Sequence, residues 1–124
     1  MNNRKVRVLV VDDSAFMRTM ITDLLTTSGE IEVVGVARNG VEALERVRVL
    51  RPDVITLDVE MPEMDGLETL DHLMREYPTP VVMLSSVTKD ATESTLQAME
   101  RGAVDFVTKP GGTISLHLKA VECE

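Results

Sequence analysis

Short apolar runs alternate with helical spacings of apolar residues along the whole chain. The first run, 6–11, is rich in β-branched residues and stops at Asp12-Asp13, which predicts a buried strand. Apolar residues then recur at helical spacing from Ser14 to Ser28-Gly29, which predicts a helix. The apolar positions of this helix are Phe16, Met17, Met20, Ile21, Leu24 and Leu25.

The same alternation continues to the end of the chain. Further strands are expected at 31–36, 53–57, 81–84 and 105–107. Helices are expected from Asn39-Gly40 to about residue 51, before Pro52, and around 67–76. A weaker helix is expected at 90–101, with Gly102 as its C-terminal cap and Leu96, Ala98 and Met99 as its apolar positions. The segment 113–124 could begin a fifth helix.

Five strand and helix patterns in alternation are typical of βαβ units. Several of the strands are apolar almost throughout, as in a parallel sheet that is covered on both faces. Right-handed crossovers would place helices on both sides of the sheet. The pattern therefore predicts one α/β domain over residues 1–124, built on an open, doubly wound parallel sheet.

Composition narrows the function classes. A length of 124 residues suits one domain, and 44% hydrophobic residues are enough for one core. The net charge of -8 argues against nucleic acid as a partner and is compatible with cation binding.

Cys123 is the only cysteine, so an intrachain disulfide is impossible. No secretory signal is recognisable, and no apolar run approaches the ~20 residues that span a bilayer. We therefore expect a cytoplasmic protein without direct membrane insertion.

Polar residues follow the expected strands. Asp58 stands where the third apolar run ends, and Pro62 and Asp65-Gly66 predict a loop beyond it. The carboxyl ends of parallel strands lie on one edge of a sheet, where ligands bind. The side chains expected to meet there are those of Asp12, Asp13, Asp58, Ser85, Ser86 and Lys109.

This set of side chains suits phosphoryl transfer. Three crowded carboxylates repel one another, which predicts raised pKa values unless a cation compensates. Oxygen ligands and a site that keeps several waters favour Mg²⁺. Lys109 offers a point charge and Ser85 a hydroxyl to phosphoryl oxygens. In-line transfer of a phosphoryl group to Asp58 needs such charge stabilisation.

Each motif alone has a structural explanation. Asp12-Asp13-Ser14 could simply cap the first helix. Ser85-Ser86 and Lys109-Pro110 are ordinary loop residues when taken singly. Their expected meeting at one edge of the sheet is what favours a functional site.

The chain resembles the receiver domain of two-component response regulators over nearly its whole length. The resemblance rests on 10–14, on Asp58 with Met61-Pro62 and 64–66, on Ser85, and on Lys109-Pro110. It implies a flavodoxin-like five-stranded sheet of order 2-1-3-4-5.

The resemblance also implies a role for each residue. Asp58 would be the phosphoacceptor, Asp13 a direct Mg²⁺ ligand and Asp12 a ligand through water. The backbone carbonyl of Glu60 would complete the protein ligands, and Lys109 would pair with the phosphoryl group. Ser85 and Phe106 stand at the two switch positions: movement of the Ser85 hydroxyl towards the acyl phosphate would let Phe106 turn inward. Glu60 and Val87 would tune the approach of water.

Within this family, 57–62, 80–86 and 102–110 are most similar to the regulatory domain of chemotaxis protein-glutamate methylesterases. In such proteins a chemotaxis histidine kinase phosphorylates the receiver. This relieves inhibition of a hydrolase domain that demethylates receptor glutamates and can deamidate glutamines, so chemoreceptors are indirect partners.

The present sequence ends at Glu124 without a Gly-x-Ser-x-Gly elbow, and His72 and His117 have polar neighbours. We therefore expect an isolated regulatory domain, without the methylesterase domain and with its last helix cut short; whether it counts as an enzyme stays open.

Other functions remain alternatives. A stand-alone receiver that acts by binding a partner would share every motif. An aspartate-nucleophile phosphatase needs a second acid two residues after the nucleophile, and Glu60 has that spacing. A dinucleotide-binding domain is the weakest alternative, because no Gly-x-Gly-x-x-Gly follows the first strand.

Overall fold

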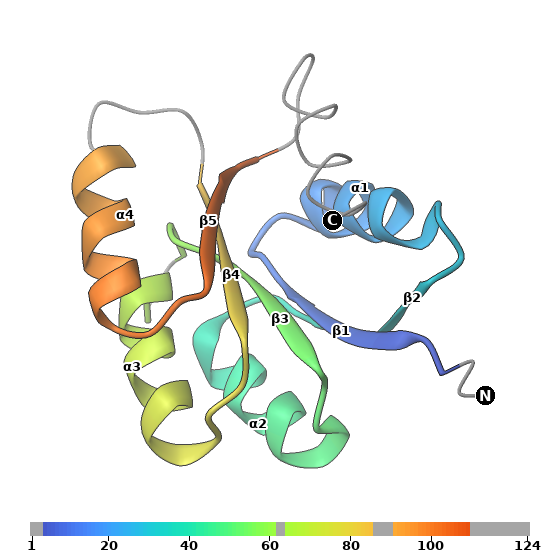
Figure 1. Ribbon diagram of the computed structural model, residues 1–124, viewed down its shortest axis with the longest axis horizontal. Coiled ribbons are helices and arrows are strands. Elements are labelled where there is room, and N and C mark those ends of the chain that lie inside the picture. The colour runs from blue at the N-terminus through green and yellow to red at the C-terminus, as the bar shows by residue number, and fades with distance from the viewer. Residues whose placement is uncertain (1–3, 62–63, 86–90, 110–124) are drawn as a thin grey trace.

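The computed structural model describes residues 4–61, 64–85 and 91–109, in which strands and helices alternate (Figure 1). The strands are β1 (Val6–Val11), β2 (Ile31–Ala37), β3 (Val54–Asp58), β4 (Val81–Ser85) and β5 (Asp105–Thr108). The helices are α1 (Ala15–Thr26), α2 (Gly40–Leu50), α3 (Gly66–Glu76) and α4 (Ala91–Glu100). The expected segment 113–124, like Ser86, Val87 and His117, lies outside the described residues.

All strand pairs in the sheet are parallel, and the strand order is β2-β1-β3-β4-β5. This confirms the predicted doubly wound architecture and its order. The register between β1 and β2 shifts once, because Val8 pairs with Val33 and Leu9 pairs with Gly35, which leaves Val34 as an extra residue in β2.

Helices cover both faces of the sheet. In Figure 1, α1 lies on one side, whereas α2, α3 and α4 lie on the other. The core under α1 contains Val8, Val10, Ile21, Leu25, Leu84 and Val107. The larger core includes Leu9, Ile55, Leu57 and Met83 of the sheet with Val47, Leu70, Leu73 and Ala98 of the helices. Fully apolar central strands are thus buried on both faces, as the sequence pattern indicated.

Polar side chains fix the start of three helices. Ser14, Asn39 and Asp65 are the N-caps of α1, α2 and α3, and each side-chain oxygen accepts a hydrogen bond from the backbone N–H three residues later. Asp65-Gly66 therefore begins α3 directly, where the sequence predicted a loop. Arg51 ends α2 in the left-handed region with a φ of 49°, next to Pro52 as expected. Gly102 follows α4 with a φ of +109°, consistent with a glycine cap.

In α1 and α4, side chains that helical spacing assigns to the apolar face lie at the surface. In α4 only Ala98 of the three expected apolar positions is buried, whereas Leu96 is 61% and Met99 is 46% exposed. In α1, Ile21 and Leu25 are buried, but Phe16 is 67% exposed. Helical spacing identifies side chains on related faces, but packing decides which of these faces meets the sheet.

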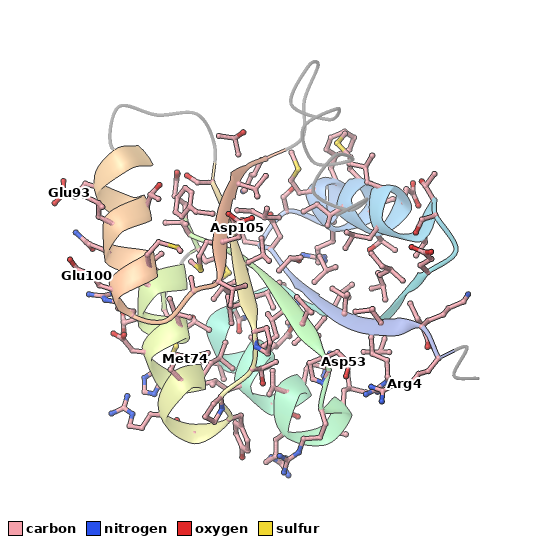
Figure 2. All side chains as sticks on the ribbon, viewed as in Figure 1. Arg4, Asp53, Met74, Glu93, Glu100 and Asp105 are labelled. Atoms are coloured by element: carbon pink, nitrogen blue, oxygen red, sulfur yellow. The ribbon has the colours of Figure 1, made fainter. Side chains whose placement is uncertain are left out.

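The amino-terminal edge of the sheet is held by Asp53, just before β3. Its carboxylate accepts a hydrogen bond from the backbone N–H of Arg7 at 2.9 Å and pairs with Arg4, as Figure 2 shows for the labelled Arg4 and Asp53. The hydrogen bond from the N–H of Arg7 is the larger cause that lowers the pKa of Asp53, and the contact with Arg4 lowers it further.

Among the described residues, no helix is long and apolar enough to cross a bilayer.

Candidate functional site

Three carboxylates meet at the carboxyl edge of the central strands. Asp12 and Asp13 follow β1, and Asp58 is the last residue of β3. One oxygen from each side chain lies within 4.8 Å of the others. Asp12 and Asp58 are completely buried, whereas Asp13 is exposed. The cluster is therefore open to solvent on the side of Asp13.

Backbone contacts from two neighbouring elements fix Asp12. Its N–H donates to the carbonyl of Ala37 at 3.0 Å, at the end of the adjacent strand β2. Its carbonyl accepts from Nη1 of Arg18 at 2.8 Å, and its Oδ1 accepts from the N–H of Ser14 at 2.9 Å. The first two bonds hold the backbone of Asp12, and the third orients its carboxylate.

The backbone after Asp58 is fixed in the same way. Val59 donates its N–H to the carbonyl of Leu84 at 2.9 Å and accepts from the N–H of Gly66 at 2.8 Å. The N–H of Glu60 turns back to Asp58 Oδ1 at 3.2 Å. A side chain at Gly66 would strike the backbone of Asp58 and Val59, so α3 starts directly against the segment that carries the carboxylate.

Lys109 connects the two buried acids. Its Nζ lies 3.0 Å from Asp58 Oδ1 and 3.3 Å from Asp12 Oδ2. Its own N–H donates to the carbonyl of Ser85 at 2.7 Å, so the ends of β4 and β5 position the ammonium group. Its side chain is only 15% exposed, and it brings a positive charge into a pocket that otherwise carries acids.

Burial controls the ionisation of these groups. Desolvation raises the pKa of Asp58 to about 7, and the negative charge of Asp12 adds to the increase, although Lys109 opposes it. Desolvation also raises the pKa of Asp12. Burial alone would lower the pKa of Lys109, but its hydrogen bond to Asp58 and the charges of both acids outweigh burial and raise it. The predicted direction is correct for Asp12 and Asp58, but desolvation is a larger cause than the repulsion between carboxylates.

The oxygens of the cluster suit a hard cation. Asp58 Oδ2 is buried and has no hydrogen-bond partner among the described residues, whereas Asp12 Oδ2, also buried, has only the ammonium of Lys109 at 3.3 Å. A buried carboxylate oxygen without a donor carries a desolvation cost that a divalent ion would remove. Oxygen donors with open access to water match the preference of Mg²⁺. The residues present therefore fit this ion.

Comparison with known proteins assigns the family. The family described as "Response regulator receiver domain" matches residues 8–121. The chain belongs to this family.

Similar proteins agree with this assignment. The chain is 60% identical over 121 residues to a protein-glutamate methylesterase/protein-glutamine glutaminase of Geobacillus kaustophilus, which covers 98% of the chain and 35% of the relative. It thus spans about a third of the length of this curated relative. The response regulator domain of CheB from Thermotoga maritima matches with a TM-score of 0.83 and 48% identity, covering 97% of this chain and 90% of the other.

A CheX–CheY–BeF3–Mg complex from Borrelia burgdorferi also matches the fold. The TM-score is 0.78 and the identity 28%, with 94% of this chain and 87% of the other covered. Together with the family match, these similarities support a response-regulator role in chemotaxis for this receiver domain.

The receiver resemblance also assigns roles to Ser85, Phe106 and Glu60 among the described residues. Ser85 is the last residue of β4, is 2% exposed, and follows Leu84, the strand partner of Asp58. Phe106 pairs with Met83 across β4 and β5 and packs, half-buried, against the larger core. Glu60 is exposed, and its carboxylate is not part of the acid cluster found in the described residues. His72 lies in α3 with Glu76 as a polar neighbour at 3.3 Å, in the helical, polar setting that the sequence predicts.

Sequence reasoning missed two supporting residues. Arg18 donates a hydrogen bond to the carbonyl of Asp12. The sequence pattern that could have identified it is a basic residue one turn into the helix that follows the two acids. Gly66 permits the close approach of α3 to Asp58, but a glycine after an aspartate reads equally well as a turn.

Proposed function

We propose that the chain is a phosphorylation switch in chemotaxis, in which Asp58 accepts a phosphoryl group from a phosphohistidine of a chemotaxis histidine kinase. The observation that supports this proposal most strongly is the environment of Asp58. Lys109 and the Glu60 N–H bind Oδ1, while Oδ2 is buried without a hydrogen-bond partner among the described residues. One oxygen is therefore oriented and the other is available for coordination or attack.

The transfer is a simple displacement. A carboxylate oxygen of Asp58 attacks phosphorus, the bond from phosphorus to the histidine nitrogen breaks, and the electron pair returns to the imidazole. Lys109 moves from partner of the carboxylate to partner of the acyl phosphate, so its charge stays close to the reacting oxygens. Attack requires the ionised acid, so the high pKa of metal-free Asp58 opposes the reaction until a cation is bound.

Mg²⁺ is the proposed cofactor. Asp12, Asp13 and Asp58 would supply carboxylate ligands, Asp12 through water, and the backbone carbonyl of Glu60 would supply another. When bound, the ion would neutralise charge on the phosphoryl oxygens. The BeF3 and Mg in the related Borrelia complex support this choice.

The proposed output lies on α4 and β5. Ser85 and Lys109 are joined through the backbone at the ends of β4 and β5, so a new hydrogen bond from the Ser85 hydroxyl to the acyl phosphate would act on both strands. Phe106 would respond by turning inward. The nearby surface carries exposed Leu96, Met99 and Val104, and the labelled Glu93 and Glu100 project from the outer side of α4 (Figure 2).

We propose a methylesterase and glutamine deamidase domain as the target of this surface. The support is the identity to methylesterase/glutaminase proteins about three times as long as this chain. Chemoreceptors would then be reached indirectly, and the protein would be cytoplasmic. A phosphatase receives no support, because the Glu60 carboxylate is outside the acid cluster of the described residues.

The proposal is tested by phosphorylation in vitro. The protein is incubated with Mg²⁺ and a small acyl phosphate donor and weighed by mass spectrometry. We expect one phosphoryl adduct on the wild type, little without Mg²⁺, and none on Asp58→Asn. Asp71→Asn, which changes a half-exposed acid on α3, serves as the matched control and should be phosphorylated normally. A folded, Mg²⁺-bound wild type that gains no adduct would refute the proposal.

A further inference from the structure

Three hollows lie side by side along β2, the strand at one edge of the sheet. Their volumes are about 260, 310 and 340 Å³. Neighbouring hollows share residues: Val36 and Arg18 line the first two, and Arg46 lines the second and third. We call this continuous region the β2-edge surface, defined by Arg18, Val34, Val36, Arg38, Arg46 and Val49.

The middle hollow is rich in guanidinium groups. Arg18, Arg38 and Arg46 line it together with one acid, Glu42. The whole chain has a net charge of -8, so the three arginines and one acid of the middle hollow are a local reversal of that charge. The outer hollows each add one acid, Asp23 in the first and Glu45 in the third. The hydrogen bond from the N–H of Arg38, together with the charges of Arg38 and Arg46, lowers the pKa of Glu42.

The arginines retain donors for a ligand. Arg46 donates Nε to the carbonyl of Val36 at 3.2 Å, and Arg38 donates Nε to Glu42 at 2.8 Å. A guanidinium has several N–H donors in a fixed fork, so each group retains donors beyond these bonds. Carboxylates match that fork.

The edge of β2 adds backbone groups and apolar area. The carbonyl of Ala37 points towards β1, where it accepts from Asp12, whereas the carbonyl of Val36 is reached by the side chain of Arg46. Alternate backbone groups of β2 thus face away from the sheet. Val36 is 40% exposed beside them, and Val49, 66% exposed, lies in the third hollow with Val34 and Leu50.

We propose that the β2-edge surface binds an extended acidic segment of a partner protein. Its backbone would pair with the edge of β2, its carboxylates would meet the three arginines, and its apolar side chains would fill the hollow beside Val49. A free phosphate would use only the arginines, so the adjoining strand edge and apolar hollow favour a peptide. The β2-edge surface is separate from the proposed output surface on α4 and β5. A protein that binds there would therefore be a partner in addition to the target of the proposed switch.

The binding test uses peptides of defined charge. A labelled Glu-Val alternating peptide as long as β2, 7 residues, is titrated by fluorescence anisotropy, with Gln-Val and Lys-Val peptides as comparisons. We expect saturable binding of the Glu-Val peptide, at least about tenfold weaker binding of the other two, and weakening as salt screens the charges. Inorganic phosphate should compete poorly.

Two pairs of variants locate the site. Arg46→Glu is compared with Arg48→Glu, which makes the same charge change on the same helix outside the hollows. Val36→Glu, at a side chain that is 40% exposed, is compared with Val41→Glu, at a valine of α2 that is 55% exposed and lines none of the three hollows. We expect Arg46→Glu and Val36→Glu to weaken binding by about tenfold and the controls by less than about twofold. Arg18 is not varied, because it also holds Asp12.

Several outcomes would overturn the proposal. They are equal binding of the three peptides, equal losses in test and control variants, or full competition by phosphate. Self-association of the free protein that Arg46→Glu abolishes would assign the edge to a second copy of the chain instead. Circular dichroism and normal phosphorylation of each variant establish that it is folded, so a loss of binding is assigned to the surface.

Discussion

Asp58→Asn is expected to stabilise the metal-free protein at pH 8, by on the order of 2–4 kcal/mol. Asp58 is completely buried, and desolvation and the charge of Asp12 raise its pKa from 3.8 to about 7. The ionised carboxylate is thus less stable in the folded protein than in the unfolded chain, in spite of Lys109. Asparagine has nearly the same shape and can still accept from the Glu60 N–H, but it carries no charge.

The pH dependence follows from the sign of this shift. Between pH 4 and pH 7 the folded state retains a proton on Asp58 that the unfolded state has lost. The stability contributed by this group is therefore complete below about pH 4 and is lost as the pH rises towards about 7. Asp58→Asn should remove most of this dependence of the free energy of unfolding on pH. Asp12, whose pKa is also raised, accounts for the remainder.

Urea denaturation in EDTA at pH 5 and pH 8 measures both effects. Asp71→Asn is the control, because this acid is half-exposed in a long contact of 3.7 Å with Arg101 and should change stability by less than about 0.5 kcal/mol. Added Mg²⁺ should stabilise the wild type more than Asp58→Asn, since the variant loses one ligand. A variant no more stable than the wild type at pH 8 in EDTA would contradict the predicted cost of ionised Asp58.

This instability is where sequence reasoning was least complete. The apolar runs and the residues after them correctly predict a parallel sheet and the edge at which Asp12, Asp58 and Lys109 meet, and the resemblance to receiver domains correctly implies the strand order. The acids were expected to repel one another, but the greater effect is the loss of water around Asp58. Burial depends on Leu84, Gly66 and other neighbours distant in sequence, so no local pattern reports it.

The dependence of burial on neighbours outside the local pattern also explains why some apolar helix residues that were expected in the core are exposed. Leu96 and Phe16 have the spacing of core residues, yet both are exposed, because Ala98 and Ile21 face the sheet instead. Asp65-Gly66 predicts the turn into the third helix, and in the structure these two residues are the N-cap and the first residue of α3, since N-caps and turns favour the same residue types. The sequence pattern predicts which residues are candidates, and the choice between them depends on packing.

Gly66→Ala is expected to destabilise the protein by about 3 kcal/mol or more and to slow phosphorylation of Asp58. An added Cβ would strike the carbonyl oxygen of Asp58 and lie 2.7 Å from Val59 Cα and 2.9 Å from the carbonyl carbon of Asp58. All three atoms are backbone atoms, so no side chain can rotate to relieve the contact. Either α3 moves outwards and weakens the Gly66 N–H bond to Val59, now 2.8 Å, or the segment carrying Asp58 shifts.

Gly29→Ala separates this clash from the general effect of losing a glycine. Gly29 has a φ of +79°, which disfavours alanine, but its Cβ would meet nothing within 4 Å. We expect it to lose only about 1 kcal/mol and to be phosphorylated at the wild-type rate. Urea denaturation at saturating Mg²⁺ and the rate of adduct formation test both variants. Equal losses in both would mean that α3 can adjust to the added methyl group, whereas slower phosphorylation of Gly66→Ala alone, measured where it is still folded, would show that the start of α3 positions the acceptor carboxylate.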